Sequence, residues 1–147
     1  MIYLDTSALV KRFVDEVGSP LVFTLIGERG PVATSKVAYA ELFAALARRK
    51  REGHLSQRQY AVACGQFETE WRAYLRVDVT DEVLVRARDL TRKHPLRGFD
   101  AIHVASALEL KMALSEEVTF SGADQRQLDA AAAEGLAIVH VESAAAS

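Results

Sequence analysis

Four carboxylates in this sequence stand among apolar or small residues, where charged side chains are uncommon. Burying an unpaired carboxylate costs several kcal/mol, and carboxylates that converge also repel one another and hold protons. A divalent cation relieves both problems, and all-oxygen ligands that retain water suit Mg²⁺ or Mn²⁺. Zinc is disfavoured because the sequence has no Cys/His cluster with the spacing of a zinc site. The four acids are Asp5, Glu41, Asp100 and Asp124.

Glu41 gives the clearest signal of the four. It is the single charge in the segment 37–47, about a turn and a half into a predicted helix. A Glu in the middle of a helix has no capping role, so its structural alternative is a buried pair with an arginine such as Arg97. Asp5 ends the apolar run 2–4, and its alternative role is to bond the amides of a local turn.

Asp100 and Asp124 stand where predicted helices begin. Asp100 is the single formal charge in the segment 98–108, and Asp124 follows the apolar run 118–121 through a Gly-Ala pair. Asp is a favoured N-cap, so each of these residues could do no more than begin a helix. The combination of four such acids is more specific than any one of them.

Short apolar runs alternate with longer helical patterns along the chain, which is typical of α/β proteins with a mostly parallel sheet. The strands are predicted at 2–4, 31–34, 75–79, 118–121 and 137–141, and the helices at 7–16, 36–52, 56–74, 81–93, 100–114 and 124–134. Ser56 and Gln59 match a capping box at the start of one helix. Sites in such sheets form outside the carboxyl ends of the strands, and Asp5 falls there.

The length of 147 residues and the apolar share of 50% predict one domain. We place this domain at residues 1–141 and a flexible tail at 142–147. No apolar run reaches the roughly 18 residues of a membrane span, and the N-terminus lacks the pattern of a secretory signal. The single Cys64 fits a reducing compartment, so the sequence predicts a cytoplasmic protein without a membrane partner.

The formal net charge of −2 excludes a uniformly basic nucleic-acid binder, but the charge is uneven along the chain. The first half is net positive and the second half is net negative. Basic residues gather at 48–51 and again at 86–97. Each stretch could face phosphates, or could be a solvated helix face or helix end.

Four segments resemble the PIN-domain family of metal-dependent ribonucleases, and most of all its small VapC-type toxins from bacterial toxin–antitoxin pairs. They are 2–11 (IYLDTSALVK), 35–42 (SKVAYAEL), 96–107 (LRGFDAIHVASA) and 119–135, and the resemblance extends over about residues 1–141. The resemblance implies a three-layer α/β/α sandwich around a mostly parallel sheet of about five strands. It implies Mg²⁺-dependent hydrolysis of RNA phosphodiester bonds, with Mn²⁺ as a substitute ion. Its acidic site maps onto Asp5, Glu41, Asp100 and Asp124.

The sequence departs from the family pattern at one place. The family usually has Thr or Ser two positions before the last acid, where this chain has Gly122, with Ser121 one residue earlier. Of the four acids, Asp124 is therefore the one whose distance from a metal the sequence predicts least well. Asp129 is a poor substitute, since it lies a turn further into the helix.

Three polar residues near the acids could support them. Thr6 or Ser7 could orient Asp5 or a metal-bound water, or could simply cap the first helix. His103 lies one helical turn after Asp100 and could hydrogen-bond that carboxylate. Its structural alternative is a buried histidine with satisfied hydrogen bonds.

Two basic residues also lie in the family-like segments. Lys11 and Arg97 could contact RNA phosphates, or could balance the acidic cluster in the empty protein. The VapC resemblance further implies a homodimer and a cognate antitoxin whose C-terminal segment covers the active-site groove.

Two other classes of protein stay open as alternatives. A haloacid-dehalogenase-like phosphatase would use Asp5 as a nucleophile, but that class needs a second Asp where this chain has Ser7. A non-catalytic binding module on the same fold would act through protein or RNA contacts. The four intact acids argue against such a module, and Gly122 argues weakly for it.

Overall fold

The computed structural model describes residues 1–28 and 30–145. Its centre is a sheet of five parallel strands in the order β3-β2-β1-β4-β5. The prediction of a mostly parallel sheet of about five strands is confirmed. The strands are β1 (Ile2–Leu4), β2 (Val32–Ser35), β3 (Leu75–Val77), β4 (Thr119–Gly122) and β5 (Ala137–His140).

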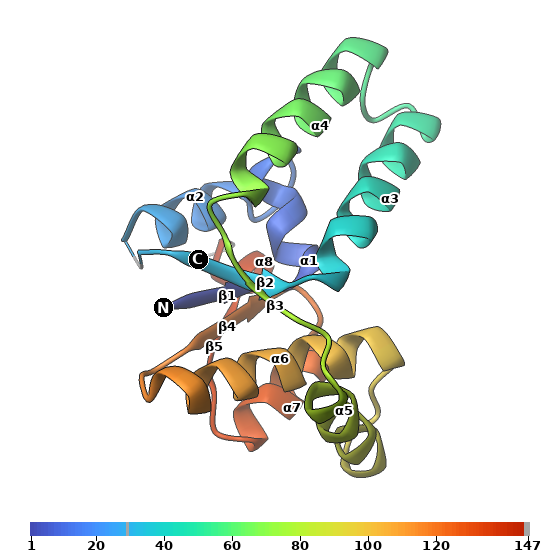
Figure 1. Cartoon of the computed structure of the whole chain (residues 1–147). Coiled ribbons are helices and arrows are strands. Elements are labelled where there is room, and N and C mark those ends of the chain that lie inside the picture. Colours follow the sequence, from blue (N-terminus) through green and yellow to red (C-terminus); the bar gives the residue numbers. More distant parts are fainter. Residues whose placement is uncertain (29, 146–147) are drawn as a thin grey trace.

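Helices cover both faces of the sheet, which gives the three layers of the predicted α/β/α sandwich (Figure 1). One face carries α1 (Thr6–Leu9), α2 (Ser19–Glu28), α3 (Val37–Arg51), α4 (Gln57–Trp71) and α8 (Val141–Ala145). The other face carries α5 (Asp81–Lys93), α6 (Gly98–Leu114) and α7 (Gln125–Ala133). Within the described ranges, no helix is long and apolar enough to cross a membrane.

The central strand β1 serves both layers because successive side chains of a strand point to opposite faces. Ile2 and Leu4 are fully buried in the cluster formed with α1 to α4, whereas Tyr3 is fully buried in the cluster formed with α5 to α7. A strand that is buried on both faces reads as a continuous apolar run, as β1 does. Asp5 is the first residue after this run, at the carboxyl end of the sheet.

The helices α3 and α4 pack against each other as a hairpin that extends away from the sheet (Figure 1). Phe67 of α4 is fully buried, and its ring lies 5.2 Å from that of Phe43 and 5.5 Å from that of Trp71 between centroids. The capping box predicted at Ser56 and Gln59 is confirmed, with both of its hydrogen bonds present.

The segment after the first helix differs from the prediction. The helix predicted at 7–16 ends early, because α1 continues only as the 3-10 turn Val10–Arg12. The Ser19 hydroxyl then donates to the Val14 carbonyl at 2.9 Å and accepts the Glu16 N–H at 3.0 Å. These bonds turn the chain into α2, a helix the prediction missed although its Ser19-Pro20 start is a helix-initiation signal.

The C-terminus also differs from the predicted flexible tail at 142–147. The helix α8 spans Val141–Ala145, where Val141 is fully buried. The Glu142 carboxylate accepts a hydrogen bond of 2.9 Å from the Lys11 ammonium. The folded part of the chain therefore continues past residue 141, while 146–147 lie outside the described residues.

Phe67→Ala is expected to lower the free energy of unfolding by about 3–5 kcal/mol, because it leaves a cavity between α3 and α4. Urea unfolding measures this loss. The control is Val62→Ala on the same helix, where the side chain is 53% exposed and the change should stay within about 0.5 kcal/mol. Equal effects of both substitutions would contradict the role given to Phe67.

Candidate metal centre

The structure brings the four predicted acids to one pocket of about 490 Å³ at the carboxyl end of the sheet. Each acid comes from a different element. Asp5 follows β1, Glu41 lies in α3, Asp100 lies in the first turn of α6, and Asp124 precedes α7. Residues that are far apart in the sequence thus share one site because the parallel strands end at one edge.

Asp5 is held in place from two sides. Its Oδ1 accepts the Ala8 N–H at 2.9 Å and the Ser7 hydroxyl at 2.7 Å, and the residue is only 4% exposed. Ser7 in turn accepts the Ala123 N–H at 3.0 Å. Asp5 therefore caps α1, as its structural alternative required, and still faces the pocket. Ser7 thus connects Asp5 to the loop after β4.

The missing side chain at Gly122 makes room for the Asp5 carboxylate. A Cβ atom at position 122 would lie 3.0 Å from Oδ2 of Asp5 and 3.1 Å from its Cγ. Such distances require a neighbour to move. In this chain, Gly122 therefore lets the Asp5 carboxylate approach the end of β4 closely.

Glu41 is fixed by a buried hydrogen-bond chain. Its Oε1 accepts the Thr6 hydroxyl at 2.7 Å, and Nε2 of His103 lies 2.8 Å from the same oxygen. The predicted partner of His103 was Asp100, and this was wrong. The register of α6 on the sheet turns His103 toward α3, and its side chain becomes nearly inaccessible, at 2% exposure.

The contacts of His103 indicate that its Nε2 carries a proton. Nε2 faces Glu41 and lies 3.2 Å from the hydroxyl oxygen of Thr6, whose proton is already donated to Glu41. Both neighbours of Nε2 therefore accept, so Nε2 carries the proton. Nδ1 lies 2.8 Å from the hydroxyl oxygen of the fully buried Tyr3.

Asp100 and Asp124 are less tightly held. Asp100 is partly buried, and its Oδ2 lies 3.8 Å from Nε of Arg97, whose side chain is 91% exposed. Asp124 is the N-cap of α7, and its Oδ1 accepts the Arg126 N–H at 3.0 Å. The capping role proposed as the alternative for Asp124 is present, together with a place in the wall of the pocket.

The electrostatic environment shifts the pKa values of the acids in different directions. Burial raises the pKa of Asp5, and burial together with the nearby charge of Asp124 raises the pKa of Asp100. Burial also acts to raise the pKa of Glu41, but the hydrogen bond and charge of His103 outweigh it, so the net shift is downward. Ionised Asp5 and Asp100 are therefore destabilised without a nearby cation.

The donor set suits a hydrated Mg²⁺ or Mn²⁺. Among residues 1–28 and 30–145, no three His, Cys, Asp or Glu side chains form a group that could hold an ion on its own. Mg²⁺ keeps several waters and is bound through one or two carboxylates together with substrate phosphates, so it needs no such cage. The all-oxygen donors, and the raised pKa values of Asp5 and Asp100, fit this mode of binding.

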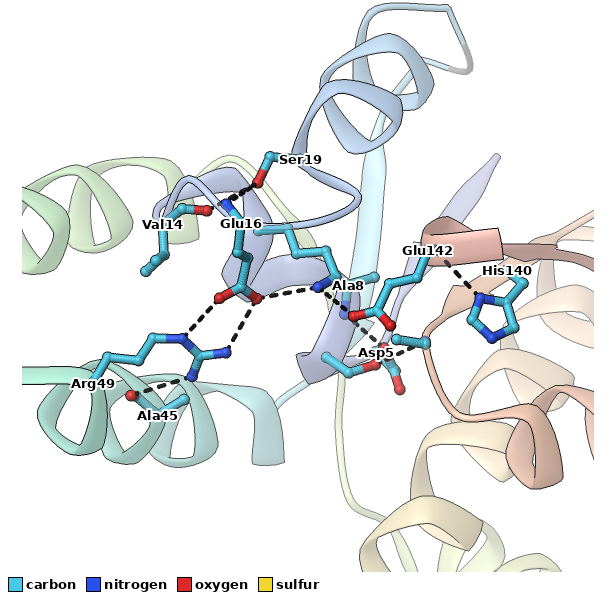
Figure 2. Close-up of polar contacts among 12 residues, drawn as sticks. Asp5, Ala8, Val14, Glu16, Ser19, Ala45, Arg49, His140 and Glu142 are labelled. Carbon is cyan, nitrogen blue, oxygen red and sulfur yellow. Dashed lines mark hydrogen bonds and ion pairs between the residues drawn. The ribbon is translucent and has the colours of Figure 1, made fainter. Parts of the chain in front are cut away.

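Lys11 does not reach the acidic pocket, contrary to its predicted phosphate contact. Its side chain is only 4% exposed, and its ammonium bonds Glu16 at 3.1 Å and Glu142 at 2.9 Å. Glu16 also accepts both arms of the Arg49 guanidinium, at 3.0 and 3.1 Å (Figure 2). The buried cation is neutralised by these two carboxylates, which leaves it unavailable to a phosphate.

The pocket also contains residues that the sequence did not single out as members of the site: Arg48, Arg49, Phe99 and Gln127. Gln127 is 1% exposed, and its Nε2 donates to the Asp100 carbonyl at 3.2 Å. Its Oε1 has no hydrogen-bond partner among the described residues. The available signal was its place three residues after Asp124, on the same side of a helix.

Comparison with known proteins supports one assignment. A model of the PIN domain matches residues 2–134. The chain belongs to the PIN-domain family. Ribonuclease VapC45 of Mycobacterium tuberculosis (strain CDC 1551 / Oshkosh) is 40% identical over 108 residues, which cover 74% of this chain and 75% of its own length. Ribonuclease VapC46 of Mycobacterium tuberculosis (strain ATCC 25618 / H37Rv) is 35% identical over 138 residues, covering 94% and 95%. This PIN domain is therefore of the VapC type.

A solved structure shows the same fold. The toxin-antitoxin complex from Klebsiella pneumoniae matches this PIN domain with a TM-score of 0.64, over 96% of this chain and 98% of that chain. The sequence identity is 13%, so this similarity concerns the fold alone.

Gly122→Ala in this PIN domain is expected to weaken Mn²⁺ binding about tenfold, because the added methyl group displaces the Asp5 carboxylate. Isothermal titration measures the affinity. Gly65→Ala is the matched control, since a Cβ at position 65 of α4 would meet no atom within 4 Å. That control should keep the affinity and gain about 1 kcal/mol in stability. Unchanged binding in Gly122→Ala would contradict the packing argument.

Asp5→Asn is expected to stabilise the metal-free protein at neutral pH, because the pKa of Asp5 is raised in the folded state. When the pKa of a group is higher in the folded than in the unfolded state, the group stabilises the folded protein fully at pH values below its unfolded pKa, which is about 3.9 for Asp. That stabilisation is lost as the pH rises through the folded pKa. The advantage of the variant should therefore vanish in acid.

Urea unfolding in EDTA over a range of pH measures this difference. The exposed Asp129→Asn on α7 serves as the control and should change little. Added Mg²⁺ should reverse the order, since it stabilises the wild type by binding the folded state. A variant that is less stable than the wild type in EDTA at neutral pH would contradict the burial argument.

Proposed function

We propose that this chain is a Mg²⁺-dependent endoribonuclease that hydrolyses RNA phosphodiester bonds and is inhibited by a cognate antitoxin. The observation that carries the proposal is the meeting of four carboxylates from four elements in one pocket of a VapC-type PIN domain. The relatives VapC45 and VapC46 are named ribonucleases, and that name supports the reaction class.

Asp5, Glu41, Asp100 and Asp124 would hold the metal ion directly or through water, and Mn²⁺ would substitute for Mg²⁺. Bound there, the ion supplies a lowered pKa for a coordinated water and stabilises charge on the phosphate in the transition state. The two firmly held acids would fix the position of the ion, since Asp5 and Glu41 each accept two hydrogen bonds.

Other residues of the chain would orient two of these acids. Ser7 and Thr6 donate to Asp5 and Glu41, respectively. His103 donates its Nε2 proton to Glu41, so it acts as a positioning residue and not as the base of the reaction. Arg97, which is highly exposed beside Asp100, would contact a substrate phosphate and bring positive charge to the rim of the pocket.

The proposed partners are RNA and an antitoxin. The matched Klebsiella pneumoniae structure is a toxin-antitoxin complex, which supports an antitoxin for this chain as well. We expect the antitoxin to cover the acidic pocket and to bring a cation to it. A homodimer and a cytoplasmic location also belong to this proposal.

The two rival classes fit the site less well. A dehalogenase-like phosphatase would need a second carboxylate at position 7, where Ser7 instead donates to Asp5. A non-catalytic binding module would not need the hydrogen-bond chain of Tyr3, His103 and Thr6 that fixes Glu41.

Asp5→Asn and Glu41→Gln are each expected to lower the rate of RNA cleavage at least about 100-fold, because each removes a metal ligand. The purified chain, free of partners, is incubated with mixed cellular RNA in Mg²⁺, Mn²⁺ or EDTA, and cut ends are sequenced. Asp129→Asn is the matched control and should cleave like the wild type.

The products separate the proposed reaction from a contaminant. We expect 5′-phosphate ends that appear only with a divalent ion and disappear in both variants. Cleavage that survives EDTA or Asp5→Asn would argue against the proposed site. If titration also showed that Mg²⁺ binding does not depend on Asp5, the non-catalytic binding module would replace the ribonuclease as the proposed function.

A further inference from the structure

Phe99 is an aromatic residue that the folded core does not use. It lies in the first turn of α6, directly before Asp100, and is 58% exposed. The two apolar clusters of the described residues do not include it, and no aromatic or cation–π contact within that part of the chain involves its ring. Removing the apolar surface of an exposed phenylalanine from water is favourable, so the ring of Phe99 can contribute to the binding of another molecule.

The position of the ring is what distinguishes it from other exposed apolar side chains, which are common on protein surfaces. Phe99 lines the same pocket as the four carboxylates. Phe23, the other half-exposed phenylalanine at 50% exposure, lies on α2, where Arg12 covers its ring at 5.1 Å. Phe99 is therefore the aromatic surface presented at the site of the proposed chemistry.

Three arginines line the same pocket as the ring. Arg97 precedes Phe99 at the N-cap of α6, and Arg48 of α3 lines the same pocket with 73% of its side chain exposed. Arg48 pairs with Glu52 at 2.7 Å on the surface, and such exposed pairs are weak enough to exchange for a phosphate. Arg49 is instead held by both oxygens of Glu16.

We propose that Phe99 stacks on an unpaired nucleobase of the RNA, next to the phosphate at the acidic pocket, while Arg97 and Arg48 contact the flanking phosphates. This inference rests on the proposed ribonuclease function and adds the residues that position its substrate. Aromatic platforms combined with cations that follow the backbone are the usual means of binding single-stranded nucleic acid.

The arrangement favours single-stranded RNA over a duplex. A base must leave its helical stack to lie on the face of Phe99, and a duplex pays for that unstacking. Stacking accepts every base, because each has a π-face. Phe99 thus selects for an unpaired nucleotide at the cleavage site more than for its sequence.

Binding is measured with all variants built on Asp5→Asn, so that the RNA stays intact in Mg²⁺. The probe is a pool of short single-stranded RNAs of random sequence, with a central 2-aminopurine whose fluorescence falls on stacking, and anisotropy reports affinity. Phe99→Ala should lose the quenching and bind about tenfold more weakly. Phe99→Tyr should keep both within about twofold, since it retains the ring.

One control separates stacking from other effects. Phe23→Ala removes a ring of similar exposure outside the pocket and should leave RNA binding unchanged.

The phosphate contacts are tested by the salt dependence of binding. Arg48→Ala should reduce the slope of log affinity against log salt by about one, as expected for one lost phosphate contact. The exposed Arg92→Ala on α5 should not change that slope. Circular dichroism melting of each variant verifies that it folds.

Three outcomes would overturn the inference: Phe99→Ala with unchanged quenching and affinity, duplex RNA bound as tightly as single-stranded RNA, or Phe99→Ala altering the sedimentation of the protein alone while RNA affinity persists. The last outcome would make Phe99 a contact between copies of the chain. The proposed function is tested separately, because cleavage by the wild type does not enter this binding assay. If the wild type cleaves RNA but Phe99→Ala does not weaken RNA binding, the proposed ribonuclease function stands and the stacking role of Phe99 is rejected.

Discussion

The placement of the Asp5 carboxylate, almost out of contact with water at the end of the central strand, is the constraint on which the site depends. Backbone pairing continues past β1, because the Asp5 N–H donates to the Ser121 carbonyl at 3.1 Å. The carboxylate is then confined between the start of α1 and Gly122, whose lack of a side chain gives it room. Its burial is unfavourable in the charged state, which is why the proposed function places a cation beside it.

The other three acids are held to different degrees, which suits an ion that keeps part of its water. Glu41 is locked by Thr6 and His103, whereas Asp100 and Asp124 lie at helix starts with fewer constraints. In the proposed site, rigid carboxylates on one side and adaptable carboxylates on the other would allow a hydrated ion and a phosphate to share the pocket.

Charged residues of the same type have opposite roles according to where the fold puts them. Lys11 is buried between Glu16 and Glu142 and joins the first helical segment to α8. Arg49 is fixed by Glu16, but its neighbour Arg48 is exposed at the pocket. A basic residue in a family-like segment is therefore not by itself a sign of nucleic-acid contact. Its carboxylate neighbours decide whether its charge is available.

The sequence by itself predicted the five strands, most of the helices and the four acids that the structure brings to one pocket, because burial periodicity and isolated charges are local signals. The three layers were implied by the resemblance to the PIN-domain family. The sequence did not determine α2, whose weak pattern follows an unforeseen turn at Ser19. Only the tertiary structure decided that His103 bonds Glu41 instead of Asp100, and that Phe99 borders the pocket. These outcomes depend on how α3, α6 and the sheet pack, and spacing along one helix carries no information about packing between elements far apart in the chain.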